Sequence, residues 1–171
     1  MNFDFKSQIG QDAFILEQLG PITNGTFLDI GAHDPIHLSN TYVLEKQLNW
    51  RGIVVDIEGY YKPKWDIERP RSKFIVANAL DVDWLKELRD NNMPSVIDYL
   101  NVDLDPPQVT MQAMMRLPFD QYVFKVITFE TDYYRDITTQ TPSREFLQNR
   151  GYRLVKSVNE QDDWYVHESV R

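Results

Sequence analysis

Short apolar runs alternate with more polar segments along most of the chain. Five runs each hold several consecutive apolar residues and end in polar or turn residues, at 25–30, 52–56, 73–77, 96–103 and 123–129. Apolar runs of this length are typical of strands that are buried on both faces of a sheet. They therefore predict five strands of one mostly parallel sheet, with the intervening segments covering its two faces.

The segments between these runs predict helices. One helix is expected over 42–49, after residues that commonly cap helices. A second begins at a capping carboxylate, either Asp81 or Asp83, and ends near 91–94. A third is expected over 108–116. The alternation of strand and helix is thus maintained up to the fifth strand.

The end of the chain departs from this alternation. Thr141 followed by Pro142 predicts a helix start, and Gly151 suits the end of that helix. The segments 152–158 and 164–167 are joined by a polar turn and predict an antiparallel hairpin. The pattern therefore predicts a Rossmann-like α/β fold with a seven-stranded, mostly parallel sheet, one antiparallel strand from the hairpin and helices on both faces.

Length and composition agree with one globular domain. A chain of 171 residues, 42% of them hydrophobic, can form a single core. We expect one domain over 1–171, with a leading helical segment at 1–22 and a Rossmann-like core at 23–171. The absence of cysteine excludes disulfides, thiolate metal sites and cysteine nucleophiles. No membrane-length apolar run or secretion signal is visible, so a cytoplasmic protein without a membrane partner is expected.

The negative charge of the chain disfavours nucleic acids as partners. The net charge is −8, and an acidic surface repels the phosphate backbone of nucleic acids. We therefore expect a small-molecule or glycan partner and no nucleic acid.

An open sheet of this kind binds ligands at the carboxyl ends of its strands. The first strand ends in Asp29, Gly31, Ala32 and His33, and a glycine here permits close approach of the backbone to a ligand. The loop continues with 34–35, an aspartate and a proline, where a dinucleotide site would have further glycines. A carboxylate is unfavourable beside a pyrophosphate but acceptable beside a sulfonium and an amino group. The loop therefore favours S-adenosylmethionine (SAM) over NAD.

Polar residues also follow the other strands. Asp56 comes 25 residues after Gly31, near the roughly 20 residues expected for a carboxylate that accepts hydrogen bonds from the ribose hydroxyls. Ile57 follows it and is expected in the same cofactor site. After the third strand, Asn78 and Ala79 suit the edge of an adenine and equally suit a turn that leads into a helix.

Methyl transfer to a hydroxyl benefits from a base near the acceptor. The candidates are His33, Asp103 and Glu130, although His33 is equally well explained as a loop residue that packs or caps. His37 and His167 are expected to have no role.

The sequence favours no metal site. Asp103, Asp105 and Asp132 could together hold Mg²⁺, but this interpretation is the less favoured one. Zinc is disfavoured because the chain has no cysteine and three scattered histidines.

Several motifs together resemble those of the FkbM-type SAM-dependent methyltransferases. They cover nearly the whole chain and are most specific between 7 and 56: SQIGQD (7–12), FLDIGAHDP (27–35), SNT (39–41), LE (44–45), NWRG (49–52), VVD (54–56), YLNVDLD (99–105), ITFE (127–130), GY (151–152) and DWY (163–165). The resemblance implies a class I methyltransferase fold, SAM as cofactor, S-adenosylhomocysteine (SAH) as product, and O-methylation of a sugar, glycan or small metabolite.

The resemblance also implies roles for individual residues. The methionine end of SAM would contact Asp29, Gly31 and Ala32, and the ribose would contact Asp56. Further contacts would come from Asn78 and Ala79 at the adenine edge, from Asp103 beside the sulfonium, and from Gln11 and Asp12 on a leading helix that closes over the cofactor.

The chain departs from the family pattern in two respects. Pro106 and Pro107 replace the usual Glu-Gly continuation after the fourth strand, and no separate substrate lid is expected. An open site suits a large acceptor or a pocket completed by a second subunit of a homodimer. These departures keep open a SAM-binding domain that has lost catalysis and acts as a sensor or interaction module. A nucleotide-sugar or NAD enzyme is a third hypothesis.

Overall fold

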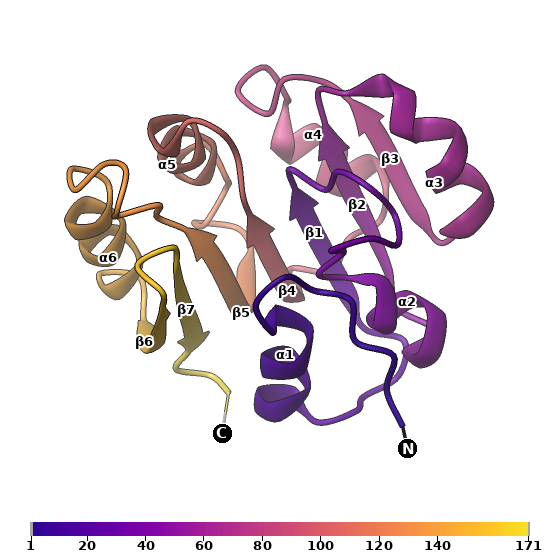
Figure 1. The fold of residues 1–171 in the computed structure, drawn as a ribbon, viewed down its shortest axis with the longest axis horizontal. Helices are drawn as coiled ribbons and strands as arrows, with labels where there is room; N and C mark the ends of the chain where they lie inside the picture. Colours follow the sequence, from indigo (N-terminus) through magenta and orange to yellow (C-terminus); the bar gives the residue numbers. More distant parts are fainter. Residues whose placement is uncertain (1, 171) are drawn as a thin grey trace.

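The computed structural model describes residues 2–170, which form one seven-stranded sheet with helices on both faces (Figure 1). The order across the sheet is β3-β2-β1-β4-β5-β7-β6, and β7 alone runs against the other strands. This arrangement confirms the predicted Rossmann-like, mostly parallel sheet. The strands are β1 Thr26–Ile30, β2 Arg51–Asp56, β3 Ser72–Val76, β4 Val96–Val102, β5 Val123–Glu130, β6 Tyr152–Val158 and β7 Asp162–His167.

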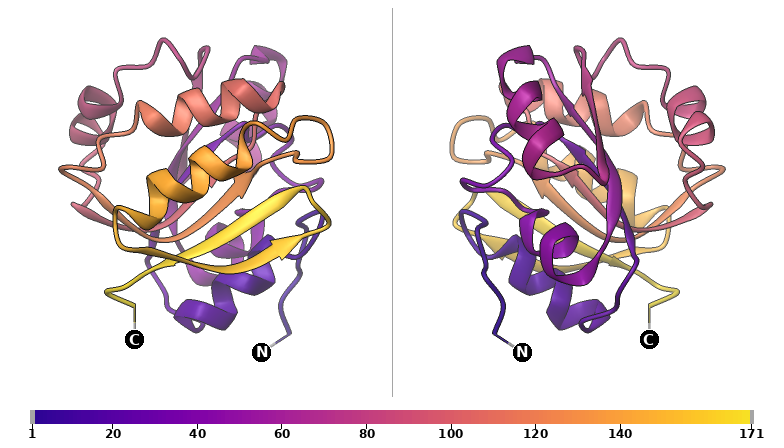
Figure 2. Two further views of the ribbon diagram at one scale, coloured as in Figure 1. Left: turned by 90° about the vertical axis from the view of Figure 1, so that its left-hand side faces the viewer. Right: turned by 90° about the vertical axis from the view of Figure 1, so that its right-hand side faces the viewer.

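The helices divide evenly between the two faces of the sheet (Figure 2). Helices α1 to α3 pack on one face and α4 to α6 on the other. A 3₁₀ turn over Gly59–Tyr61 leads directly into α3. The helices are α1 Gln11–Leu19, α2 Tyr42–Leu48, α3 Lys62–Glu68, α4 Trp84–Asp90, α5 Pro107–Met115 and α6 Gln140–Gln148.

Each face of the sheet has its own apolar core. On one side Leu88 of α4 and Leu147 of α6 are fully buried against the strands. On the other side Ile15 of α1, Leu44 of α2 and Trp65 of α3 are fully buried. Burial of one such side chain contributes about 1.5–3 kcal/mol. Four of the five apolar runs form strands inside the sheet, where helices cover both faces, whereas the run at 73–77 forms the edge strand β3.

The start of α6 differs from the sequence prediction. The helix begins at Gln140 after Thr139, so Thr141 and Pro142 lie inside its first turn. A proline is tolerated there because the first four backbone N–H groups of a helix have no intrahelical partner. The Thr139 hydroxyl donates to the carbonyl of Thr131 at 2.9 Å. The helix start is therefore fixed by a contact with Thr131, which lies ten residues before the predicted cap Thr141.

The strand registers bring several strand ends to one edge of the sheet. Ile30 at the end of β1 lies between Val55 of β2 and Val102 of β4. Val102 in turn lies beside Phe129 of β5. Because these four strands are parallel, the residues that follow them meet at the same edge, as the sequence predicted.

Within residues 2–170, none of the helices combines the length and apolarity needed to cross a membrane.

Candidate functional site

Two adjoining cavities lie at the carboxyl edge of the sheet. The larger, of about 440 Å³, is lined by seven of the predicted site residues: Asp29, Gly31, Ala32, His33, Asp56, Ile57 and Asp103. The smaller, of about 230 Å³, contains the predicted Asn78 and Ala79. Asp56, Ile57, Leu104 and Asp105 line both cavities, so the two spaces adjoin each other at these residues.

Gly31 lets the ends of β1 and β4 approach each other closely. Its φ is +87°, and a Cβ at this position would lie 1.7 Å from the carbonyl oxygen of Asp103. The backbone N–H groups of Gly31 and Ala32 both donate to the carbonyl of Val55, at 2.9 and 3.3 Å. The loop therefore offers a ligand close backbone contact, while these two N–H groups are already used within the protein.

Asp56 is fixed at the junction of the two cavities. One carboxylate oxygen accepts a hydrogen bond from the backbone N–H of His33, and the other accepts from that of Glu58, both at 2.8 Å. Each oxygen keeps a second lone pair for a ligand. The carboxylate is thus oriented before any ligand binds.

Asp29 lies at the floor of the larger cavity. Its carboxylate accepts hydrogen bonds from the amide of Asn101 at 2.9 Å and from the hydroxyl of Thr41 at 3.1 Å. Burial raises the pKa of Asp29, and these two donors oppose the rise. Asn101 is itself held by the Thr128 hydroxyl at 2.8 Å, so a polar network crosses β1, β4 and β5.

The smaller cavity has a mostly apolar wall. Its apolar lining comes from β2, the loop after β3 and α5 and consists of Val55, Ala77, Ala79, Leu80 and Val109, with Ile57 and Leu104 shared. Asn78 uses its side-chain oxygen to accept from the backbone N–H of Leu80 at 3.0 Å. A flat apolar group with polar edges, such as a purine, matches this lining.

His33 is held on the Asp56 side of the site. Its ring packs on Tyr61 with 4.4 Å between ring centroids, and Nε2 is hydrogen bonded to the Tyr61 hydroxyl. Its backbone carbonyl accepts from the Trp65 indole at 2.7 Å. His37, for which no role was expected, also lines the larger cavity.

Gln11 and Asp12 lie on α1, as predicted, but line neither cavity. Asp12 accepts from the backbone N–H groups of Lys6 and Ser7, and the amide of Gln11 donates to Asp162 at 3.2 Å. Gln11 also accepts from the backbone N–H of Ile9 at 3.2 Å, so both side chains organise the segment that precedes α1. That segment carries Gln8, which does line the larger cavity.

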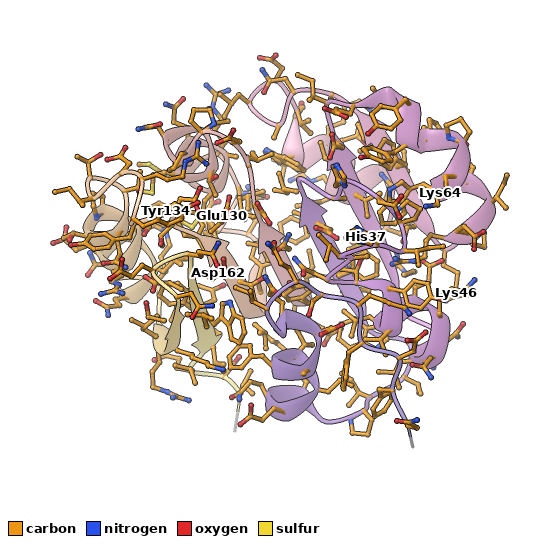
Figure 3. The ribbon with its side chains drawn as sticks, viewed as in Figure 1. His37, Lys46, Lys64, Glu130, Tyr134 and Asp162 are labelled. Atoms are coloured by element: carbon orange, nitrogen blue, oxygen red, sulfur yellow. The ribbon has the colours of Figure 1, made fainter. Side chains whose placement is uncertain are left out.

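Three carboxyl groups follow one another across β4, β5 and β7. Glu130 of β5 is paired directly with Asp162 of β7 (Figure 3). Asp103 follows Val102 of β4, which lies beside Phe129 of β5. Asp103 and Glu130 are in hydrogen-bond contact. Burial raises the pKa of both groups, that of Asp103 to about 6 and that of Glu130 to about 10. The charge of Asp103 adds to the rise at Glu130, whereas the contact with Glu130 opposes the rise at Asp103. Near neutral pH the pair therefore holds one proton.

This proton makes stability depend on pH. At pH 8 Glu130 takes up a proton on folding, because an unfolded glutamate is ionised above its ordinary pKa of 4.5. The stabilisation that this proton provides is fully present below pH 4.5, and it is lost as the pH rises through the pKa of Glu130 in the folded protein. Glu130→Gln should therefore raise the free energy of unfolding at pH 8 by about 1–2 kcal/mol, after allowance for solvent screening, and by almost nothing at pH 4.

Urea denaturation at the two pH values measures this difference. The exposed Glu17→Gln variant on α1 serves as the matched control, and its stability should follow that of the wild type. An equal gain for Glu130→Gln at both pH values would show that the pair does not share a proton.

Two of the three carboxylates considered for Mg²⁺ are paired with an arginine. Arg135 bridges Asp105 and Asp132, with both contacts at 2.7 Å. Among residues 2–170 no group of three histidine, aspartate or glutamate side chains converges in a way that could hold a metal ion.

The larger cavity also contains residues that the sequence patterns had not assigned to a site. Gln8, Asn40, Asn101 and Leu104 line it together with His37 and Leu38. Asn101 could have been found, because it lies two residues before Asp103 and residues two apart in a strand point to the same face. Asn40 and Gln8 come from irregular segments whose position no periodicity reveals.

Comparison with known proteins identifies the fold. No protein-family model matches the chain, and no curated protein sequence is significantly similar to it. A TDP-rhamnose 3′-O-methyltransferase of calicheamicin biosynthesis superposes with a TM-score of 0.61 at 16% identity, over 94% of this chain and 78% of that one. A putative rRNA methylase from Clostridium thermocellum gives 0.60 at 15% identity, over 95% and 96%.

A third solved structure contains a ligand. TrmK from M. capricolum, in complex with SAH, superposes with a TM-score of 0.58 at 12% identity, over 94% of this chain and 69% of that one. At these identities the likeness concerns the fold. The chain therefore has the Rossmann-like fold found in SAM-dependent methyltransferases.

Proposed function

We propose that this protein is a SAM-dependent methyltransferase of the FkbM type that methylates a hydroxyl group on a sugar, glycan or small metabolite. The observation that carries the proposal is the pair of joined cavities at the carboxyl edge, with the Asp56 carboxylate at their junction. An adenosine carrying a charged amino-acid tail has this sequence of parts: an apolar base, a diol and a polar end. The SAH complex of a structural neighbour supports this choice of cofactor.

The lining residues suit the parts of SAM in order. The adenine would occupy the small cavity against Asn78 and Ala79, and the ribose hydroxyls would donate to Asp56, with Ile57 beside them. The amino-acid tail would extend into the larger cavity toward Asp29. Gly31 and Ala32 would contribute close packing rather than hydrogen bonds, because their N–H groups are bonded to Val55.

When bound, SAM supplies a methyl group that an acceptor oxygen attacks in line, while the electrons of the broken C–S bond pass to sulfur and give SAH. The protein then has to position the acceptor and take its proton. Asp103 and Glu130 suit this task, because their ionised member can accept a proton beside the larger cavity. His33 is less suited, because its Nε2 is engaged by Tyr61. Gln11 and Asp12 would support the site indirectly, through the segment that carries Gln8.

Ligand binding tests the cofactor assignment. Calorimetry should show binding of SAM and SAH by the wild type and no binding of NAD. Asp56→Ala should weaken SAH binding at least about tenfold, since a hydrogen bond to a charged group contributes about 1.5–3 kcal/mol. Asp66→Ala, which removes an exposed carboxylate on α3, should leave it unchanged. Binding of NAD in place of SAM would contradict the proposal.

Turnover separates an enzyme from a degenerate SAM-binding module. The protein is incubated with SAM and panels of glycans, nucleotide sugars and small hydroxylated metabolites, and the formation of SAH is measured. Acceptor-dependent SAH formation is expected. Tight SAH binding without turnover on any acceptor would favour the non-catalytic module.

A further inference from the structure

The loop between β1 and α2 presents a buried amide to the larger cavity. Asn40 lines this cavity, and only 7% of its surface is exposed. Its Oδ1 atom has no hydrogen-bond partner. Of the buried side-chain polar atoms in residues 2–170 that belong to the cavity lining, this is the one without a partner. A buried acceptor in this state costs free energy that a ligand with a donor group can offset.

A buried arginine holds the backbone on both sides of Asn40. Arg69 is fully buried and donates to the carbonyl of Pro35 at 3.0 Å and to that of Thr41 at 2.9 Å. It also donates to the hydroxyl of Ser39 at 3.3 Å. The residues directly before and after Asn40 are therefore fixed, which holds the backbone of Asn40 at the wall of the cavity.

The neighbouring acceptors in this part of the cavity already have donors. The two oxygens of Asp29 accept from Asn101 and from Thr41, the residue next to Asn40. Asp56 accepts from two backbone N–H groups. Each of these carboxylate oxygens keeps one lone pair, whereas Asn40 Oδ1 has no donor at all and gains its first hydrogen bond from a ligand that brings a donor to this wall.

The shape of the site indicates which part of the ligand arrives there. Asn40 lines the larger cavity but not the smaller, apolar one, and Asp56 lies between the two. A nucleoside with its base in the small cavity and its ribose at Asp56 extends its 5′ substituent toward Asp29 and Asn40. In the cofactor proposed above, that substituent ends in an ammonium group and a carboxylate.

We propose that Asn40 binds the amino-acid end of the cofactor, with Oδ1 accepting a hydrogen bond from the α-ammonium group. Arg69 acts as a positioning residue that holds Asn40 through Ser39 and Thr41. This inference rests on the proposed function and assigns to the amino-acid end a residue that lies outside the strand-end motifs.

A pair of ligands isolates this contact. SAH carries the amino-acid end, whereas 5′-methylthioadenosine has the same adenosine and sulfur without it. Calorimetry, with competition against SAH for weak binding, gives both affinities. Asn40→Ala should weaken SAH binding about tenfold or more and change 5′-methylthioadenosine binding by less than about twofold. Asn40→Asp, which keeps an oxygen acceptor, should retain the preference for SAH.

The outcomes separate this inference from the cofactor assignment. An equal loss for both ligands in Asn40→Ala, or no loss for either, would overturn the role of Asn40, as would a lost preference in Asn40→Asp. Failure of the wild type to bind either ligand would refute the cofactor assignment and the inference with it. Circular dichroism checks folding, and Asn40→Ser, whose hydroxyl is too short to reach the same position, replaces the alanine variant if that does not fold.

Discussion

Replacing Arg69 by methionine is expected to lower the free energy of unfolding by about 3–5 kcal/mol. The guanidinium is fully buried and pairs with the buried carboxylate of Glu45 at 2.9 Å. Methionine fills a similar volume but leaves Glu45 without its counter-charge. Glu45 would keep only its contacts with Ser72 and with the backbone N–H of Arg71. An uncompensated buried carboxylate is the main cost.

The ring environment of Arg69 adds to this expectation. Its guanidinium carbon lies 4.8 Å from the centre of the Trp65 ring and 5.9 Å from those of Phe27 and Tyr42. Lysine could supply a charge but not the forked donors that reach Glu45, Pro35 and the Thr41 carbonyl together. Arg69→Lys should therefore also destabilise the protein.

Urea denaturation followed by circular dichroism measures the effect. Lys62→Met breaks an exposed ion pair with Asp66 on α3 and should change the stability little. The double variant Arg69→Met with Glu45→Gln should recover part of the loss, because it removes the unpaired charge. A loss for Arg69→Met no larger than that for Lys62→Met would show that the buried pair does not hold this region together.

The sheet could be predicted because most of its strands correspond to continuous apolar runs in the sequence. Residues 52–56 and 73–77 match β2 and β3 to within one residue at each end. The start of α6 could not be predicted in the same way. Thr141 and Pro142 are a strong local signal for a helix start. In the structure the helix starts earlier, and the Thr139 hydroxyl donates to the carbonyl of Thr131, a contact that forms only in the folded chain.

The candidate site likewise has residues that the sequence pattern predicts and residues that only contacts in the folded chain bring there. Asp29, Asp56 and Asp103 were predicted to lie together because parallel strands bring their carboxyl ends to one edge. Asn40 belongs to the SNT motif and to the residues that could cap a helix, but the sequence patterns assigned it no role at the ligand, since its place in the cavity wall depends on Arg69, 29 positions further along the chain. Contacts of this kind have no periodicity in the sequence.

The leading helix illustrates the limit of a motif. The sequence placed Gln11 on a helix near the cofactor, and α1 does begin there. Its amide donates to Asp162 on β7, far away in sequence, and Gln8 lines the cavity instead. Helical periodicity gives the element but not which of its neighbouring residues reaches the ligand.

Gly31→Ala is expected to combine a large loss of stability with the loss of SAH binding. The new Cβ would lie 1.7 Å from the carbonyl oxygen of Asp103 and 2.8 Å from its carbonyl carbon, so the ends of β1 and β4 would have to separate. Overpacking of this kind, added to the strain of a positive φ, should lower the free energy of unfolding by about 3 kcal/mol or more. Separation of these strand ends would displace Asp103 from the cavity wall.

Gly20→Ala provides a control that has the strain without the clash. Gly20 has a φ of +70°, but a Cβ there would meet no heavy atom within 4 Å. Its φ of +70° with a ψ of 177° is a region that residues other than glycine rarely adopt, so this variant should lose about 1–3 kcal/mol and keep its affinity for SAH. Urea denaturation and calorimetry on both variants separate the two effects. Equal losses would mean that strain alone makes glycine necessary at position 31. A larger loss for Gly31→Ala, together with weakened SAH binding, is the expected result, because the same close contact joins the two strands and shapes the cavity.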